Sequence, residues 1–366
     1  MDSLMSQDHA PKGVSTWATG LALFSMFFGA GNLIFPLLVG RAAGSESGCA
    51  VLGLGISAVL FPLLGLFAMM LYGGDLRAFL ARLGRWPGAV LMALLYMSQG
   101  PVGAMPRHFT LMHASIKPYF PTLSLFAFSL ALMVFVFCLT IRPRKMMKWL
   151  GSILTPILLL TLAVLIGAGM WNAPAASDSV EGALHHFQQG LKGGYQTLDL
   201  TAALLFATLV FPYIARGNEG GARKMLGASC IAAGLLMASY IGLCHLAAHH
   251  GVAGAPEGML HAIALNILGP AGGLIAGAAV FLACLTTNVT LAALFAEYLR
   301  REFFQGRGGL ALPLSLTLGV TAAMANIGFT GIMQALGPVL EVLYPGLIAL
   351  CLYNIYVSRR VVSPST

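Results

Sequence analysis

Charged residues are scarce in this chain of 366 residues: Asp, Glu, Lys and Arg together make up 9%, and only 12 residues are acidic. An ordinary soluble domain carries roughly 25% charged residues. So few charges could not cover a water-exposed surface of this size, which excludes a soluble enzyme and a nucleic-acid-binding protein. Hydrophobic residues make up 58% of the chain, and the mean hydropathy is +0.84. They fall in long blocks, which is typical of a chain that folds in lipid.

Motifs for metal binding, redox chemistry and hydrolysis are also missing. The six cysteines stand apart from one another in or beside apolar stretches, which favours buried packing over a zinc or redox site. Neither an HExxH zinc motif nor a GxSxG nucleophile elbow occurs, so the sequence predicts no enzyme. Residues 1–14 carry two acids and no apolar core. We therefore expect no signal peptide, and a first apolar block that stays in the membrane.

Ten apolar stretches are long enough to cross a bilayer core of about 30 Å. Glycines and prolines interrupt the end of the third stretch, between residues 100 and 106. The sequence therefore predicts an all-α integral membrane protein with ten transmembrane helices. The stretches lie near residues 15–39, 49–73, 87–105, 122–141, 149–171, 194–214, 226–248, 268–299, 310–330 and 336–357.

The basic residues between these stretches are distributed unevenly. With ten crossings, sixteen of the 20 Lys and Arg residues fall on the side of the N-terminus. Cytoplasmic loops carry such an excess of Lys and Arg, so both tails, 1–14 and 358–366, are predicted to be cytoplasmic. Four basic residues are left for the opposite side: Arg41, Arg107, Lys117 and Lys192.

The longest polar connection, 172–193, divides the chain into two halves of five crossings each. We expect it to be an extracytoplasmic linker between a first repeat, 15–171, and a second repeat, 194–357. Because five is an odd number, the second half enters the membrane from the opposite side. Two such halves form an inverted repeat, with a binding site at mid-membrane where the first and sixth helices are discontinuous.

A helix break is predicted in the first span, where Gly29-Ala30-Gly31-Asn32 is followed by Pro36. The two glycines weaken the helix and let a ligand approach the backbone, while Asn32 places a polar side chain at mid-membrane depth. Glycines in membrane helices also serve close packing alone. The added asparagine and proline exceed what packing requires, so we favour a binding site.

A second weak and polar stretch opens the sixth span, where Gly193 and Gly194 precede Gln196, Thr197 and Asp199. A long apolar run follows Asp199, which predicts that this acid lies inside the membrane. Ionisable groups there are costly and usually functional. The alternative is that the span starts later and leaves Asp199 at the membrane interface.

The eighth span places Ala283, Thr286 and Thr287 on one helical face, because residues three and four apart are neighbours on a helix. One backbone carbonyl and two hydroxyls could bind a hard cation, which prefers oxygen ligands. The alternative is that both threonines bond back to carbonyls of their own helix, as they often do in membranes.

The stretch FSMFFGAGNLIFP, from Phe24 to Pro36, resembles the bacterial branched-chain amino acid:cation symporters, the branched-chain amino acid transport system II carriers. They belong to the amino acid–polyamine–organocation superfamily, whose fold is a five-plus-five inverted repeat. Looser matches follow in the same order along nearly the whole chain: GPVGAMPR at 100–107, GYQTLDL at 194–200, ACLTTNVTLAALFAEY at 283–298 and VLYPGLIAL at 342–350.

The resemblance implies sodium-coupled uptake of leucine, isoleucine and valine by alternating access across the bacterial inner membrane. Sodium would be the coupling ion, with no organic cofactor and no nucleic-acid partner. The family pattern implies that the substrate site consists of Gly29, Ala30, Gly31, Asn32, Gln196, Thr197 and Asp199. It implies that the sodium ligands come from Ser25, Phe28, Ala283, Thr286 and Thr287.

Two features differ from the family pattern. Members usually have about twelve spans where this chain has ten, and many have a second proline where this chain has Leu37. Another mode of coupling fits the same residues, namely a proton-coupled carrier in which Asp199 titrates. A channel or a membrane-embedded enzyme is a more distant alternative, since the sequence contains neither a pore signature nor a catalytic constellation.

Overall fold

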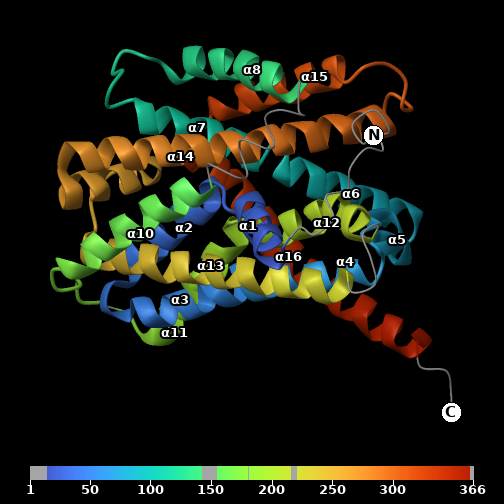
Figure 1. Cartoon of the computed structure of the whole chain (residues 1–366), viewed down its shortest axis with the longest axis horizontal. Coiled ribbons are helices and arrows are strands. Elements are labelled where there is room, and N and C mark those ends of the chain that lie inside the picture. Colours follow the sequence, from blue (N-terminus) through green and yellow to red (C-terminus); the bar gives the residue numbers. More distant parts are fainter. Residues whose placement is uncertain (1–14, 142–154, 180, 216–220, 363–366) are drawn as a thin grey trace.

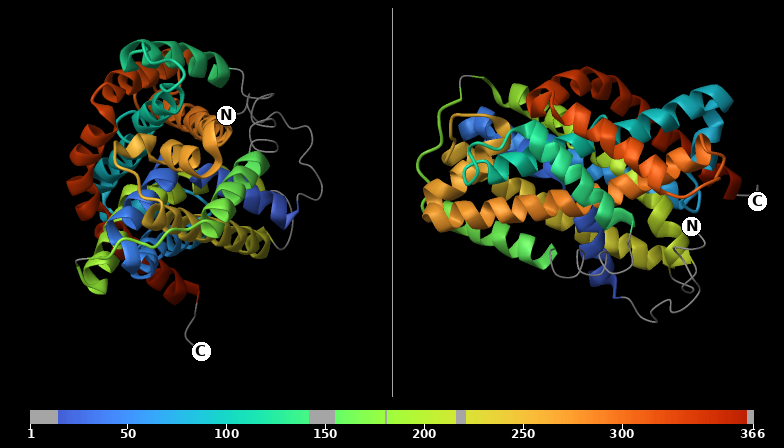
Figure 2. Two further views of the ribbon diagram at one scale, coloured as in Figure 1. Left: turned by 90° about the vertical axis from the view of Figure 1, so that its left-hand side faces the viewer. Right: turned by 90° about the horizontal axis from the view of Figure 1, so that it is seen from above.

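The computed structural model describes residues 15–141, 155–179, 181–215 and 221–362, which fold into helices with no strand in these ranges. Most helices run roughly along the long axis of the molecule (Figure 1), and the two turned views show them stacked in several layers (Figure 2). Some sequence-based expectations lie outside the described residues: the tail 1–14, the segment 149–154 of the fifth span, and Lys12, Arg142, Arg144, Lys145, Lys148 and Arg216.

The first half of the chain supplies five crossings, and two of them are broken helices. A π-helical turn, Ile56–Leu60, joins the two parts of the second crossing. The α-helices of this half are α1 (Thr16–Phe27), α2 (Ala30–Ala43), α3 (Ser47–Gly55), α4 (Phe61–Met70), α5 (Leu76–Leu80), α6 (Arg85–Gln99), α7 (Ala104–Ile116), α8 (Leu125–Ile141) and α10 (Thr155–Trp171).

The second half repeats this plan with a broken first helix. Its longest helix bends at Gly269, whose φ of 69° lies outside the helical region, and Pro270 follows directly. The α-helices are α11 (Ala183–Gln196), α12 (Asp199–Ala215), α13 (Gly221–His249), α14 (Met259–Glu302), α15 (Ala311–Ala325) and α16 (Gly328–Val362). The last of these extends into the segment that the sequence predicts as the C-terminal tail.

Five helical segments of the described chain are long and apolar enough to cross a membrane by themselves. Four shorter apolar helices accompany them: Thr16–Phe27, Leu125–Ile141, Pro156–Trp171 and Ala311–Ala325. Together with the broken pair α11 and α12, these elements form ten crossings, because the segment Ala30–Met70 contains the second part of the first crossing, which Thr16–Phe27 begins, and the whole of the second crossing. The all-α membrane fold expected from hydropathy is confirmed.

The first helix breaks where the sequence predicts. Helix α1 ends at Phe27 and α2 begins at Ala30, with Gly29 in an extended conformation (φ −119°, ψ −160°). The Gly29 N–H donates to Asn32 Oδ1 at 3.1 Å rather than to the Ser25 carbonyl one turn earlier. The asparagine side chain therefore replaces a helical hydrogen bond and stabilises the break.

The sixth helix breaks within the weak and polar stretch 193–199, as the sequence predicts. Both glycines lie inside α11, and the break falls at Leu198, whose φ is 67°. Segment 172–193 is also not entirely a linker, since α11 begins at Ala183. A Cβ on Gly194 would lie 1.8 Å from the Ser57 Oγ, so this glycine allows α11 to pack closely on the second crossing.

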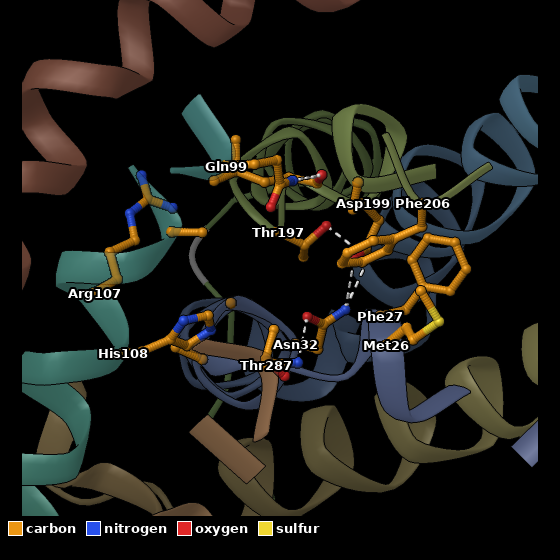
Figure 3. Close-up of a pocket in the computed structure, with 16 residues that line it drawn as sticks. Met26, Phe27, Asn32, Gln99, Arg107, His108, Thr197, Asp199, Phe206 and Thr287 are labelled. Carbon is orange, nitrogen blue, oxygen red and sulfur yellow. Dashed lines mark hydrogen bonds between the residues drawn. The ribbon is translucent and has the colours of Figure 1, made fainter. Parts of the chain in front are cut away.

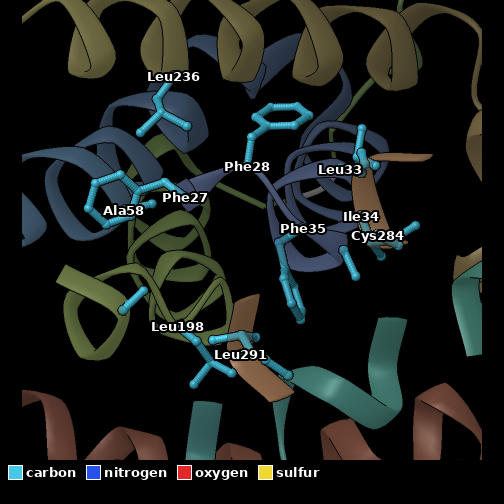
Figure 4. Close-up of a cluster of buried hydrophobic side chains, with 14 of the residues drawn as sticks. Phe27, Phe28, Leu33, Ile34, Phe35, Ala58, Leu198, Leu236, Cys284 and Leu291 are labelled. Carbon is cyan, nitrogen blue, oxygen red and sulfur yellow. The ribbon is translucent and has the colours of Figure 1, made fainter. Parts of the chain in front are cut away.

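The apolar core surrounds the two breaks. Phe24 stacks on Phe28 at a centroid distance of 4.8 Å, and Phe27 meets Phe206 of α12 edge-on at 6.0 Å. Figure 4 shows Phe27 and Phe28, at the end of α1, in the same cluster of buried side chains as Leu198 from the second break. This packing keeps the two non-helical segments next to each other in the middle of the bundle.

Candidate functional site

A cavity lies between the two helix breaks, and the space there that protein atoms do not fill, including the part open to solvent, is about 360 Å³. Figure 3 shows side chains from α1, α2, α6, α7, α12 and α14 around it. Six of the seven residues expected at the substrate site line this cavity: Gly29, Ala30, Gly31, Asn32, Thr197 and Asp199. The seventh, Gln196, lies just behind the lining, where its carbonyl and side chain both accept hydrogen bonds from Arg107.

Asp199 is the acceptor at the centre of a buried network. Asp199 is 1% exposed, so it lies inside the bundle and not at the membrane interface. The Asn32 Nδ2 donates to both carboxylate oxygens, at 2.9 and 2.8 Å. Thr197 Oγ1 and the Tyr240 hydroxyl each donate to Oδ2, at 2.9 and 2.8 Å. One carboxylate thus joins both broken helices to α13.

Replacing Tyr240 with phenylalanine is expected to loosen this junction. The change removes a hydrogen bond to a charged group, which is worth about 1.5–3 kcal/mol. We expect the detergent-solubilised variant to unfold at a lower temperature than the wild type, by an amount corresponding to that loss. Tyr353→Phe is the matched control, because Tyr353 is more than half exposed. Equal unfolding temperatures for both variants would show that the Tyr240 hydroxyl contributes nothing.

The start of α2 presents backbone donors to the same cavity. Among the described residues, no acceptor is found for the N–H groups of Ala30, Gly31 and Asn32. The first N–H groups of any helix lack intrahelical partners, and the helix dipole makes this end positive. This wall of the cavity is therefore suited to an anionic group.

A second cavity lies on the other side of α1 and contains four of the five residues expected to bind the cation. Its lining includes Ser25, Phe28, Ala283 and Thr286, together with apolar residues of α10 and α14. Thr287, the fifth expected ligand, lines the first cavity instead. The two threonines lie side by side on α14, and each faces a different cavity.

The oxygen atoms of this second cavity are only partly used by the protein. The hydroxyls of Thr286 and Thr287 donate to the Ala283 carbonyl, at 2.8 and 3.2 Å, so the back-bonding that threonines favour does occur. Donation leaves the lone pairs of Thr286 Oγ1 available. The Ser25 and Phe28 carbonyls accept no backbone hydrogen bond from the described residues, because the helix ends there. A small hard cation is suited to such neutral oxygens.

Helices α6 and α7 contribute three polar cavity residues that the sequence analysis did not select: Gln99, Arg107 and His108. Gln99 Nε2 donates to the Leu198 carbonyl at 2.6 Å, and Arg107 donates to the Gln196 carbonyl at 2.8 Å. These side chains satisfy carbonyls that the second break frees. The interruption of the third span by glycine and proline was the available signal, since α6 ends and α7 begins there.

The placement of Arg107 corrects one expectation. The charge count assigned it to an extracytoplasmic loop, whereas the structure buries it within α7 at 1% exposure. Hydropathy counts the break between α6 and α7 as the end of a span, although the chain continues as α7 in the same direction. Three of the four basic residues assigned to that side, Arg41, Lys117 and Lys192, are thus left in the count.

Comparison with known proteins identifies the family. A family model described as branched-chain amino acid transport protein matches residues 12–363. The chain belongs to this family. It is 31% identical to the branched-chain amino acid transport system 3 carrier protein of Pseudomonas aeruginosa, over 97% of this chain and 85% of that one. It is 29% identical to the permease BrnQ of Escherichia coli K12, over 95% and 82%.

Solved structures support the fold of this branched-chain amino acid transport protein. The inward-facing conformation of Mhp1 matches with a TM-score of 0.67 and 14% identity, over 96% of this chain and 78% of that one. The structure of MhsT in complex with L-phenylalanine matches with a TM-score of 0.63 and 16% identity, over 93% and 89%. These likenesses confirm the five-plus-five inverted repeat with discontinuous first and sixth helices.

Family and fold together define the class of protein. Both curated relatives are named as carriers or permeases, and the chain is a multi-pass helical membrane protein. The family member described here is therefore a transport protein and not an enzyme. The cavity between its broken helices occupies the position where transporters of this architecture bind their substrates.

Proposed function

We propose that this protein takes up leucine, isoleucine and valine together with sodium, by alternating access. The observation that carries the proposal is the meeting of both helix breaks at one cavity, with a second cavity on the other side of α1 whose lining includes Ser25 and Thr286. The names of the relatives support branched-chain amino acids as substrates. The oxygen set of the second cavity supports sodium.

The first cavity offers a complementary group for each part of an aliphatic amino acid. The free N–H groups at the start of α2 suit the carboxylate, and carbonyl oxygens freed at the breaks suit the ammonium group. Met26, Phe27 and Phe206 form an apolar wall for the side chain. One methylene is worth only about 1–3 kcal/mol in such a pocket, so leucine, isoleucine and valine should compete with one another.

The cation pocket can couple sodium to the substrate because both sites share α1. Ser25 and Phe28 at the end of α1 face Ala283 and Thr286 of α14 across the second cavity. A bound cation would draw these two helices together through their oxygens. That movement fixes the segment at Gly29, which lines the substrate cavity, so filling one site favours filling the other.

Thr286→Ala should weaken sodium activation. The change removes a hydroxyl oxygen from the proposed ion site, and a polar contact to a charge is worth about 1.5–3 kcal/mol. We expect the sodium concentration for half-maximal leucine uptake to rise by at least about tenfold. Thr290→Ala is the matched control, since Thr290 lies one turn along the same helix and outside both cavities. An unchanged sodium dependence in Thr286→Ala would exclude this threonine as a ligand.

The proposed function is tested by uptake of labelled leucine into proteoliposomes. An inward sodium gradient is imposed with an inside-negative potential, and unlabelled isoleucine and valine are added as competitors. Sodium-dependent uptake that both competitors block is the expected result. A potential of 100 mV contributes about 2.3 kcal/mol for each sodium ion, so uptake should also be electrogenic. Failure of all three amino acids to be transported under any gradient would overturn the substrate assignment.

A proton-coupled carrier is the second candidate, and the buried carboxylate favours it. Among the residues that the structure describes, Asp199 is the only acid that lines the first cavity, and no basic residue forms an ion pair with it. Uptake that follows a pH gradient and ignores sodium would assign coupling to Asp199. In that case Thr286→Ala would transport leucine normally, so the same variants distinguish the two modes.

We propose that both termini face the cytoplasm of a bacterial inner membrane. The excess of basic residues on the N-terminal side supports this orientation, and it increases when Arg107 is removed from the loop count. We place the start of the second repeat at Ala183 rather than 194, because α11 and α12 together form its broken first helix.

A further inference from the structure

Arg107 is a buried cation without a counter-ion. It lines the substrate cavity from α7 and is 1% exposed. Its two terminal nitrogens donate to neutral oxygens of Gln196, at 2.8 and 3.1 Å, while Nε has no hydrogen-bond partner. The ring of Phe35 lies 5.6 Å from the guanidinium carbon. None of the described carboxylates forms an ion pair with it.

The acid in the same cavity does not compensate this charge. Asp199 already accepts hydrogen bonds from Asn32, Thr197 and Tyr240, and no bond joins it to Arg107. A buried charge that lacks a partner is costly, so the protein gains when an anion enters beside it. Figure 3 shows Arg107 and His108 on the wall of the cavity opposite Asp199.

His108 defines where such an anion would lie. Its Nε2 would be 2.7 Å from a Cβ built on Gly29, which places the imidazole directly over the start of α2. Its Nδ1 is buried and has no partner. The Arg107 guanidinium, the His108 imidazole and the free N–H groups of Ala30 and Gly31 therefore border the same cavity.

We propose that Arg107 binds the carboxylate of the transported amino acid. This inference rests on the proposed function and adds a charged ligand from α7 to the backbone donors of α2. A guanidinium matches a planar carboxylate and forms stronger hydrogen bonds with it than with a neutral amide. The arginine would thus select substrates that carry a carboxylate, while the apolar wall selects their side chains.

A merely structural role for Arg107 makes a different prediction. The side chain also stands at the end of α11, where a positive charge stabilises the helix and satisfies the Gln196 carbonyl. Loss of that role would distort the second break and weaken every ligand of the cavity alike. Loss of a carboxylate ligand would weaken only ligands that possess a carboxylate.

The test compares binding of leucine with binding of leucinamide, in which a neutral amide replaces the carboxylate. Wild-type protein should prefer leucine by about tenfold to a hundredfold, the range expected for hydrogen bonds to a charged group. In Arg107→Gln this preference should shrink to the part that the α2 backbone donors supply, because leucine binding falls while leucinamide binding changes little. Arg107→Lys keeps the charge without the planar fork and should retain an intermediate preference.

Arg41→Gln is the matched control. Arg41 lies at the far end of α2, also donates to backbone carbonyls, and is outside the cavity. It should leave the preference for leucine unchanged. A wild-type preference that survives in Arg107→Gln overturns this inference and leaves the proposed function standing. If Arg107→Gln does not fold, the inference is overturned instead by Arg107→Lys, should that variant prefer leucine over leucinamide as strongly as the wild type does. Wild-type protein that binds no leucine overturns both.

Discussion

Asp199→Asn is expected to abolish leucine uptake and to destabilise the protein, although the two side chains have almost the same shape. Asn32 Nδ2 contacts both carboxylate oxygens, at 2.9 and 2.8 Å. Either orientation of a new amide would therefore direct an NH₂ group at another NH₂ group. Asn32 cannot turn over to relieve this, because its own Oδ1 accepts the Gly29 N–H at 3.1 Å.

The expected loss has two parts. A donor left buried without an acceptor costs about 1–3 kcal/mol, and the charge that strengthened the bonds from Thr197 and Tyr240 is also removed. Because these bonds connect both helix breaks, their loss disturbs the substrate cavity directly. We expect uptake to fall by at least about a hundredfold, which corresponds to about 2.8 kcal/mol.

The measurement combines initial uptake rates in proteoliposomes with thermal unfolding in detergent. Asp75→Asn provides the control, because Asp75 caps the short helix α5 through its side chain and asparagine caps equally well. The control should transport and unfold like the wild type. If Asp199→Asn did the same, the network around Asp199 would be irrelevant to both the fold and the site.

The sequence predicts both breaks, but it fixes the exact residue only for the first, and the reason is physical. At Gly29 the local residues suffice, since Asn32 is three positions away and caps the break itself. At Leu198 the positive φ of a bulky residue is maintained by tertiary contacts. Gln99, a hundred residues away in sequence, donates to the Leu198 carbonyl. No local pattern reports such a partner, so the sequence indicates the stretch 193–199 but not the residue at which the helix breaks.

The wall contributed by α7 was missed for a related reason. Arginine between apolar stretches is normally a loop residue, and the positive-inside rule treats it so. Only the folded chain shows that Arg107 reaches the carbonyl at the end of α11.

For the threonine pair, helical spacing predicted a shared position that the structure divides between two cavities. Spacing placed Thr286 and Thr287 on one face, but adjacent helical residues are far enough apart in direction to face two cavities.

Gly31→Ala should produce the other large effect, because Gly31 is where the two breaks approach each other most closely. A Cβ at this position would lie 2.9 Å from the Thr197 Cα and 3.0 Å from the Thr197 carbonyl oxygen. Both atoms belong to the backbone, so no change of rotamer can relieve the contact. One helix must move away from the other, and such overpacking typically costs about 1–3 kcal/mol.

This movement would act on function more than on stability. Asn32 follows Gly31 directly and holds Asp199 through two hydrogen bonds, so any retreat of α2 lengthens both. We expect leucine affinity to fall by about tenfold to a hundredfold, from the same 1–3 kcal/mol. Titration of leucine binding by isothermal calorimetry measures it directly.

Gly234→Ala is the matched control for this substitution. Gly234 lies within α13, and a Cβ there would meet no atom within 4 Å. Alanine in an exposed helix position is favourable by roughly 0.5–1 kcal/mol over glycine, so this variant should be as stable as the wild type or slightly more stable. Equal leucine affinities in the two variants would mean that α2 can separate from the second break without cost, and the site would then require a different account of how the two halves meet.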